Sequence, residues 1–237
     1  MFEDIGTFLR VLAPGIPITV FATLGGIALT IVLAFAAGLA LLSPSRTVRV
    51  ISRIYVEGLR GTSEVVQLFW IFFALPLLVG FQIVPIWAGI VVLGLNHGAY
   101  GAEIVRGAVQ SVPKAQYEGA IALSLTPAQR MRRVILPQAV VEMIPPFNTL
   151  FIQLLKSTAL LSFVAIDEIT NLANQRLIPN FGPQSWLVWI VVLVIYLLLA
   201  LVITVVMRLL EAAAAARVGR TPSARARKLA ATTVGGA

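Results

Sequence analysis

The chain is organised by five long apolar stretches separated by short polar segments. We predict membrane-spanning helices at about 17–42, 64–81, 85–108, 140–165 and 185–210. A hydrocarbon core of about 30 Å is crossed by roughly 20 helical residues, and the first and last stretches exceed that length. Both are apolar on every face, whereas strands of a membrane barrel alternate in polarity over about 10 residues. The pattern therefore predicts an all-α integral membrane protein.

The third and fourth predicted spans carry polar residues and helix breakers. The third begins near Pro85 and becomes less apolar at Asn96. The fourth contains residues of both kinds: Glu142, Pro145, Pro146, Asn148, Gln153 and Lys156. At membrane depth, such residues are tolerated where protein buries them or where they line a watery cavity. We therefore expect these two helices to face the interior of the bundle.

Along the chain, segments outside the spans that are poor in Lys and Arg alternate with segments that are rich in them. The segments before span one, between spans two and three, and between spans four and five hold at most one Arg each. The basic residues gather in the other three segments: Arg46, Arg49, Arg53 and Arg60; Lys114, Arg130, Arg132 and Arg133; and Arg208, Arg217, Arg220, Arg225, Arg227 and Lys228. Because basic loops stay cytoplasmic, this predicts an N-terminus outside and a C-terminus inside.

Composition supports a membrane protein and narrows its chemistry. Hydrophobic residues make up 59% of the 237 residues and charged residues 12%, against about 25% charged in soluble domains. The net charge of +8 could indicate nucleic-acid binding. Its basic residues lie in the loops and the tail, however, where they set the orientation of a membrane protein and lie near lipid headgroups. The chain has no Cys and a single His, His97, which argues against disulfides and a metal cluster.

The two ends of the chain differ. Residues 1–10 lack the basic stretch of a secretory signal peptide, so we expect the first apolar stretch to be retained. From about residue 212 to 237 the chain is small, basic and rich in Gly, Ala and Thr. We predict a frayed helix end there, followed by a disordered cytoplasmic tail near anionic headgroups.

The cytoplasmic loop 110–137 predicts two short helices. Pro113 suits the first turn of one that runs to about Ser124. Thr126 followed by Gln129 forms a capping-box pattern for a second, which we expect to end at Pro137. Such an element could dock into a groove on a soluble partner, or it could lie on the membrane surface.

Polar residues share one face of the third span. Asn96, Tyr100 and Glu103 are spaced by four and three residues, and Asn96 lies roughly 16 Å along the helix from Pro85. Polar groups at that depth are costly in lipid and should face the interior. With Lys156 they could line a path for a zwitterion. Alternatively, Glu103 pairs with Arg106.

The loop resembles the EAA loop of permeases of ATP-binding-cassette importers. That motif runs E-A-A, three residues, G, nine residues, I-x-L-P. Here Glu118-Gly119-Ala120, then Ser124, then Val134-Ile-Leu136-Pro137 have the same spacing. Gly119, Ser124 and Val134 depart from it, and Ser124 matters most because Gly permits a positive φ that Ser resists.

Three further stretches resemble the polar amino-acid branch of these permeases. Residues 57–67 (EGLRGTSEVVQ) are similar to E-x-x-R-G-T-P…V-Q, and residues 96–113 contain A-Y-x-x-E-x-x-R-G and Q-S-V-P. Residues 155–160 (LKSTAL) are similar to L-K-x-T-S-L. The likeness covers roughly residues 17–210, within a predicted permease domain of 1–211.

The resemblance implies a bacterial inner-membrane subunit that moves a polar amino acid. It implies a second permease, identical or paralogous, two ATPase subunits and an extracytoplasmic binding protein. ATP and Mg²⁺ would sit on the ATPases, since the chain has no phosphate-binding G-x-x-x-x-G-K-[ST] loop. The implied ATPase contacts are Glu118, Gly119, Ala120, Ser124, Leu136 and Pro137.

Other functions fit the residues less well. A channel could use Glu103 in a charged ring but needs no docking loop. An enzyme needs a convergent nucleophile, base or metal set, and none is evident. A scaffold function would not explain why span three has a polar face. Within the permeases, methionine or an organic cation remains an alternative solute.

Overall fold

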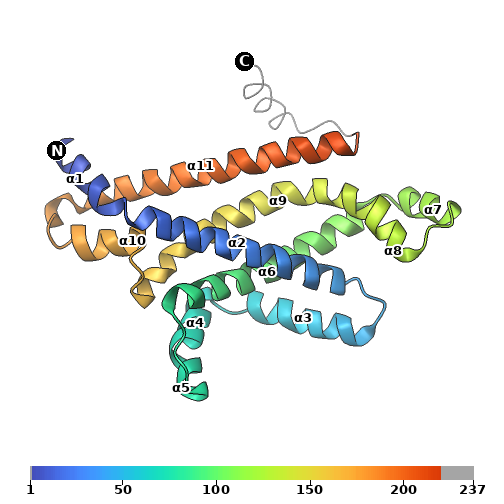
Figure 1. Ribbon diagram of the computed structural model, residues 1–237, viewed down its shortest axis with the longest axis horizontal. Coiled ribbons are helices and arrows are strands. Elements are labelled where there is room, and N and C mark those ends of the chain that lie inside the picture. Colours follow the sequence, from blue (N-terminus) through green and yellow to red (C-terminus); the bar gives the residue numbers. More distant parts are fainter. Residues whose placement is uncertain (1, 220–237) are drawn as a thin grey trace, which may run out of the picture.

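The computed structural model describes residues 2–219, which form helices joined by short turns and contain no strand. Four long helices lie side by side in Figure 1: α2 (Gly15–Ala40), α6 (Pro85–Ser111), α9 (Leu136–Ser157) and α11 (Ser185–Arg217). α6 packs against both α2 and α9, and α11 packs against α9. The all-α prediction is confirmed for this part of the chain.

Shorter elements connect and flank the four long helices. They are α1 (Phe2–Leu12), α3 (Arg46–Arg60), α4 (Glu64–Phe69), η1 (Trp70–Ala74), α5 (Leu75–Val79), α7 (Lys114–Ala122), α8 (Pro127–Arg130), η2 (Met131–Ile135), η3 (Thr158–Val164), α10 (Ile169–Leu172), η4 (Ala173–Leu177) and η5 (Gly182–Gln184). α7 and α8 lie at one end of the bundle, and α1 and α10 lie at the other (Figure 1).

α2 and α6 approach closely because small residues line their contact. A Cβ placed on Gly38 would lie 2.6 Å from the carbonyl oxygen of Ala102 and 2.7 Å from the Cβ of Val105. Small residues allow helix backbones in membranes to come this near, so that van der Waals contact holds them together. This contact fixes the position of α6, which carries the polar residues of the predicted third span.

Three helical stretches are long and apolar enough to cross a membrane: Gly15–Ala40, Pro127–Val164 and Gly182–Arg217. A fourth exists if Arg46–Arg60 and Glu64–Val79, which meet at a bend of 103°, count as one broken span. α6 has 27 residues but is not among these. Five spans and the orientation of the ends therefore remain predictions.

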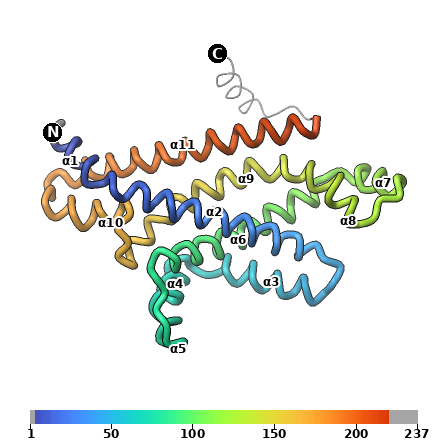
Figure 2. Tube along the Cα trace, viewed as in Figure 1, coloured from blue at the N-terminus to red at the C-terminus, as the bar shows by residue number. Residues whose placement is uncertain are grey.

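The second predicted span forms an arm that leaves the bundle. Figure 2 shows α4 and α5 projecting from the other helices. One wider, π-helical turn (η1) joins them, and Gly80, with φ of +77°, ends the arm. Its apolar side chains are largely exposed: Leu77 is 86% and Leu78 75% accessible. The bend at its base brings Glu64 back toward α6.

The predicted helix end at Pro137 is wrong. Helix continues through Pro137 as one stretch, Pro127–Val164. Proline lacks an N–H, and its ring clashes with the carbonyl four residues earlier in a regular helix. The π-helical turn η2 directly before it relaxes that clash: the Leu136 N–H donates to the carbonyl of Met131, five residues back.

The last helix extends beyond the predicted span of about 185–210. α11 continues to Arg217, past the boundary at about 211, so the predicted tail begins in regular helix. The remainder of that predicted tail, 220–237, lies outside the described residues.

Candidate functional site

A polar cavity of about 510 Å³ lies where the α3–α4 bend, α6 and α9 meet. Its volume falls within the roughly 300–1,000 Å³ typical of small-molecule sites. The residues that line it come from these elements and the start of η3: Thr62, Ser63, Glu64, Val65, Asn96, His97, Tyr100, Gln153, Lys156, Ser157 and Leu160. Most are polar, although the surrounding helices are apolar.

The bend between α3 and α4 is held by side chains of its own. Thr62 Oγ1 donates to the carbonyl of Gly58 at 2.9 Å. Gln67 Nε2 donates to Thr62 Oγ1 at 2.7 Å and to the carbonyl of Leu59 at 2.9 Å. These bonds satisfy the backbone where α3 ends and thereby fix the direction in which α4 starts.

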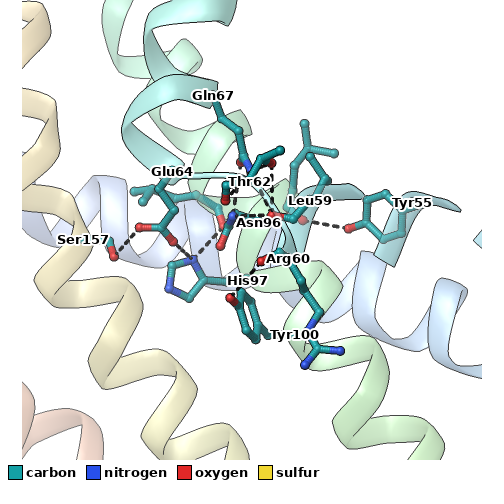
Figure 3. A network of polar contacts seen from close by, with 12 residues as sticks. Tyr55, Leu59, Arg60, Thr62, Glu64, Gln67, Asn96, His97, Tyr100 and Ser157 are labelled. Atoms are coloured by element: carbon teal, nitrogen blue, oxygen red, sulfur yellow. Dashed lines mark hydrogen bonds and ion pairs between the residues drawn. The ribbon is translucent and has the colours of Figure 1, made fainter. Parts of the chain in front are cut away.

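Asn96 ties α6 to this bend rather than standing free in the cavity. Its Nδ2 donates to the carbonyl of Leu59 at 3.0 Å and to Gln67 Oε1 at 3.2 Å (Figure 3). Asn96 is 2% exposed. Tyr55 adds a second tie, since its hydroxyl donates to the carbonyl of Leu95 at 2.9 Å. Asn96 therefore positions the cavity wall.

Glu64 is the acidic group of the cavity and joins three elements. Its Oε2 accepts from Ser157 Oγ at 2.8 Å, and its Oε1 lies 3.2 Å from His97 Nδ1. These contacts link α4 to α9 and to α6 (Figure 3). The Glu64 side chain is 21% exposed, so a ligand in the cavity can still reach its carboxylate.

Tyr100 and Lys156 are the more open members. The Tyr100 ring lies 5.0 Å beneath the Arg60 guanidinium, and its hydroxyl donates weakly to the Arg60 carbonyl at 3.4 Å. Lys156, on the last turn of α9, is exposed and has no ion pair or hydrogen bond within residues 2–219. Its ammonium group is available to an anionic ligand.

Glu103 does not line this cavity. Its Oε2 accepts from Arg106 Nε at 2.9 Å and from Nη2 at 2.6 Å, and Arg106 also donates to Gln110. Pairing with Arg106 was the alternative weighed for this residue. Of the four predicted path residues, the structure brings together Asn96, Tyr100 and Lys156.

Sequence reasoning missed Glu64, His97 and Ser157 as cavity residues. Glu64 and Ser157 do lie inside two of the motifs quoted above, which was the available signal. Their meeting depends on the 103° bend, because Glu64 and Ser157 are 93 positions apart in the chain. Periodicity within one helix cannot indicate such a contact.

The predicted coupling loop stands at the far end of the bundle (Figure 1). Glu118 and Gly119 are exposed on α7, whereas Ala120 is buried. Leu123 is 74% exposed and Ile121 57%, so the turn carries apolar side chains that this chain leaves uncovered. Leu136 and Pro137 follow this turn along the chain, and Leu136 is half-buried whereas Pro137 is exposed.

Ser124 adopts the left-handed conformation, with φ of +55°. This is the turn that the EAA motif assigns to Gly. The turn closes through two backbone bonds, from Ser124 N to the Ile121 carbonyl at 2.8 Å and from Leu125 N to the Ala120 carbonyl at 3.1 Å. The predicted capping box follows and is present between Thr126 and Gln129.

Tyr117 anchors α7 to the end of α6. Its hydroxyl donates to the carbonyl of Val109 at 3.0 Å. Burial raises the pKa of the Tyr117 hydroxyl, and the nearby charge of Arg130 partly opposes this. The loop is therefore held to the bundle while the Ile121–Ser124 edge stays exposed.

Within residues 2–219, no group of three metal-binding side chains is assembled.

Residues 26–215 match the family described as "Binding-protein-dependent transport system inner membrane component". The chain belongs to this family. The match confirms the resemblance that the loop and the flanking motifs indicated, and it covers every element that lines the cavity. The channel and scaffold alternatives are not favoured.

Two relatives illustrate the likeness of this permease. It is 43% identical over 187 residues to a "Probable amino-acid ABC transporter permease protein y4tF" of Sinorhizobium fredii, covering 77% of this chain and 78% of that one. It is 36% identical over 171 residues to the "L-cystine transport system permease protein TcyB" of Bacillus subtilis, covering 71% and 72%.

A solved structure shares the fold. The permease superposes with a TM-score of 0.79 on a chain of the "Crystal structure of an amino acid ABC transporter with histidines", at 27% identity. The superposition covers 89% of this chain and 97% of that one. The helix arrangement described above is thus that of a transporter permease.

Proposed function

We propose that this permease moves a polar amino acid across the bacterial inner membrane, by alternating access driven by separate ATPase subunits. The observation that carries the proposal is that one polar cavity is lined by both an acid, Glu64, and a base, Lys156. A zwitterion needs one partner of each sign, and a buried charge without a partner is strongly disfavoured. The names of the relatives support the amino-acid class.

In this proposal Lys156 binds the substrate carboxylate and Glu64 receives its ammonium group. Glu64 already accepts a hydrogen bond from Ser157, but a carboxylate offers about four lone-pair sites, so it can also accept from an ammonium. Tyr100 supplies an aromatic wall beside them. Asn96 acts indirectly, through the α3–α4 bend that presents Glu64.

The coupling part of the proposal rests on the loop. Glu118, Gly119, Ala120, Ser124, Leu136 and Pro137 form the ATPase contact, with the exposed Ile121 and Leu123 as its apolar centre. A short helical element whose exposed apolar side chains enter a groove is a recurrent way of docking on a soluble partner. ATP and Mg²⁺ belong to that partner. The full assembly also holds a second permease and an extracytoplasmic binding protein.

Transport in proteoliposomes that contain the assembled complex tests the cavity. Glu64→Gln and Lys156→Gln each remove one charge, and we expect at least a ten-fold loss of amino-acid uptake with subunits still associated. Glu103→Gln is the matched control, since Glu103 lies outside the cavity and pairs with Arg106. Equal losses in all three variants, or none in the first two, would reject the cavity as the substrate site.

A pull-down in mild detergent tests the loop. Tagged wild-type chain should bring down an ATPase, and Glu118→Arg should lose it because the substitution reverses the charge of an exposed contact. Lys114→Glu, at the start of the same helix α7, is the control for charge reversal away from the contact. A well-folded wild type without an ATPase contradicts the coupling proposal.

A further inference from the structure

His97 is held in the cavity wall by two hydrogen-bond acceptors. Its Nδ1 lies 3.1 Å from the carbonyl oxygen of Leu93 and 3.2 Å from Glu64 Oε1. A carbonyl and a carboxylate both accept hydrogen bonds and do not donate them. Nδ1 must therefore carry the hydrogen, and this contact fixes which nitrogen of a neutral imidazole is protonated.

The other ring nitrogen has no partner within residues 2–219, although the His97 side chain is only 4% exposed. Figure 3 shows one nitrogen directed at Glu64 and the other without a contact. In a neutral ring with hydrogen on Nδ1, Nε2 presents a lone pair. Nε2 keeps some contact with solvent at the cavity, so a ligand that donates a hydrogen bond to it would take the place of water.

The charge of the cavity agrees with a neutral ring. Glu64 contributes one negative and Lys156 one positive charge, and no other acid or base lines the cavity among the described residues. With neutral His97 these charges cancel, as they do in the amino and carboxyl groups of a zwitterionic substrate. A charged imidazolium would form an ion pair with Glu64 at 3.2 Å, and would leave the cavity with a net positive charge and no free acid for the substrate ammonium group.

We propose that His97 Nε2 accepts a hydrogen bond from the substrate side chain, and that it makes this permease prefer amino acids whose side chains end in an N–H or O–H donor. Amides, guanidinium groups and hydroxyls satisfy it, whereas a side-chain carboxylate turns an oxygen lone pair toward it. Sites built around one hydrogen bond can discriminate by several orders of magnitude, because the wrong ligand leaves a buried polar group unpaired. The inference rests on the proposed substrate cavity.

Nitrogen NMR tests the inference directly, because His97 is the single His of the chain. The full chain, labelled with ¹⁵N-histidine and purified by a tag without histidine, is assembled with unlabelled partner subunits in lipid nanodiscs. We expect a protonated Nδ1 and an unprotonated Nε2 at neutral pH. Addition of L-glutamine should shift the Nε2 signal, and L-glutamate should not. A protonated Nε2, or equal responses to both ligands, overturns the proposal.

A variant separates specificity from structure. His97→Asn retains an amide N–H near the position of Nδ1, and so retains a donor for Glu64, but has no group at the position of Nε2. Competition of L-glutamate against bound radiolabelled L-glutamine, measured on the complex without its binding protein, reports the preference of the permease alone. We expect the preference for glutamine to fall at least ten-fold in His97→Asn and to stay unchanged in Glu103→Gln.

The two failures are distinguishable. If neither amino acid binds to the wild-type complex and the complex transports no amino acid, the substrate cavity itself is wrong, and this inference fails with it. If wild type transports amino acids but His97→Asn keeps its preference for glutamine, only the role of His97 fails. Should the variant not assemble, the wild-type spectrum still decides the protonation of Nε2 and its response to ligand.

Discussion

Ser157 Oγ donates a 2.8 Å hydrogen bond to Glu64 Oε2 and thereby joins the end of α9 to the first turn of α4. The bond is half-buried, which strengthens a hydrogen bond to a charged acceptor relative to one in water. It adds to the contacts that Glu64 makes with His97 and that Gln67 makes with the bend and with Asn96. The same bond keeps the carboxylate directed into the cavity.

Removing that hydroxyl should loosen the base of the arm. Ser157→Ala is expected to cost about 1 kcal/mol of stability, the usual value for one hydrogen bond, and to lower substrate affinity through a mobile Glu64. Thermal unfolding and uptake measure the two effects. Ser162→Ala is the control, since the Ser162 hydroxyl donates only to the nearby Ala159 carbonyl. Equal effects of both substitutions would contradict a special role for Ser157.

The turn at Ser124 should accept glycine readily. A left-handed conformation costs a residue with a side chain roughly 1–2 kcal/mol, and most for β-branched residues. We expect Ser124→Gly to keep or raise stability and ATPase association, and Ser124→Val to lower stability by at least about 1 kcal/mol. Thermal unfolding of the detergent-solubilised complex compares them. A valine variant as stable as the glycine variant would show that the φ of +55° is not required.

The contact between α2 and α6 should not tolerate one added methyl group at Gly38. The alanine Cβ would meet the Ala102 carbonyl oxygen at 2.6 Å, which is backbone and cannot turn aside. Overpacking of this kind costs about 1–3 kcal/mol. Gly107→Ala is the matched control, because a Cβ there meets nothing within 4 Å. The difference between the thermal midpoints of the two variants measures the closeness of the helices.

Glu168 should make stability depend on pH. This side chain is fully buried between η3 and α10, outside the candidate spans, and accepts hydrogen bonds from the N–H groups of Thr170 and Asn171 and the hydroxyl of Tyr196. Burial raises the pKa of Glu168, and the backbone hydrogen bonds partly oppose this.

A raised pKa means that the folded protein holds this proton more tightly than the unfolded chain. The stability it contributes is therefore fully present below the ordinary glutamate pKa and is lost as pH rises through the folded value. Glu168→Gln has no such proton, so its stability should change less between pH 5 and pH 8. Asp167→Asn, at an exposed neighbour paired with Arg176, is the control. A pH dependence unchanged by Glu168→Gln would contradict the prediction.

Local patterns predicted much of the fold and the starts of both helices in the coupling loop. Apolar stretches indicated the long helices because lipid demands about 20 apolar residues wherever a helix crosses. The capping box at Thr126 was readable because it depends on residues within one turn of each other. The left-handed conformation of Ser124 was not predicted, because Ser departs from the Gly of the motif and resists a positive φ. The family resemblance, which the comparison with relatives confirms, was carried by motifs of the same local kind.

Pro137 shows where a local rule fails. Proline interrupts a regular helix, yet a π-helical turn and the packing of Ile135 and Ala139, both buried, let the helix continue through it. Such a rearrangement is decided by what the helix packs against, which the sequence of one segment does not record.

The cavity was decided only by the tertiary structure. By itself the sequence predicted that polar residues of spans three and four face inward, because polar groups in lipid are costly. The structure buries Asn96, whereas Tyr100 and Lys156 are exposed members of the cavity lining. The sequence could not determine the partners of these polar residues. Glu103 forms an ion pair with Arg106, one helical turn away. Glu64 contacts His97 and Ser157 because the chain bends by 103° between α3 and α4. Contacts within a helix follow from spacing, but contacts between helices depend on bends and close packing that bring distant residues together.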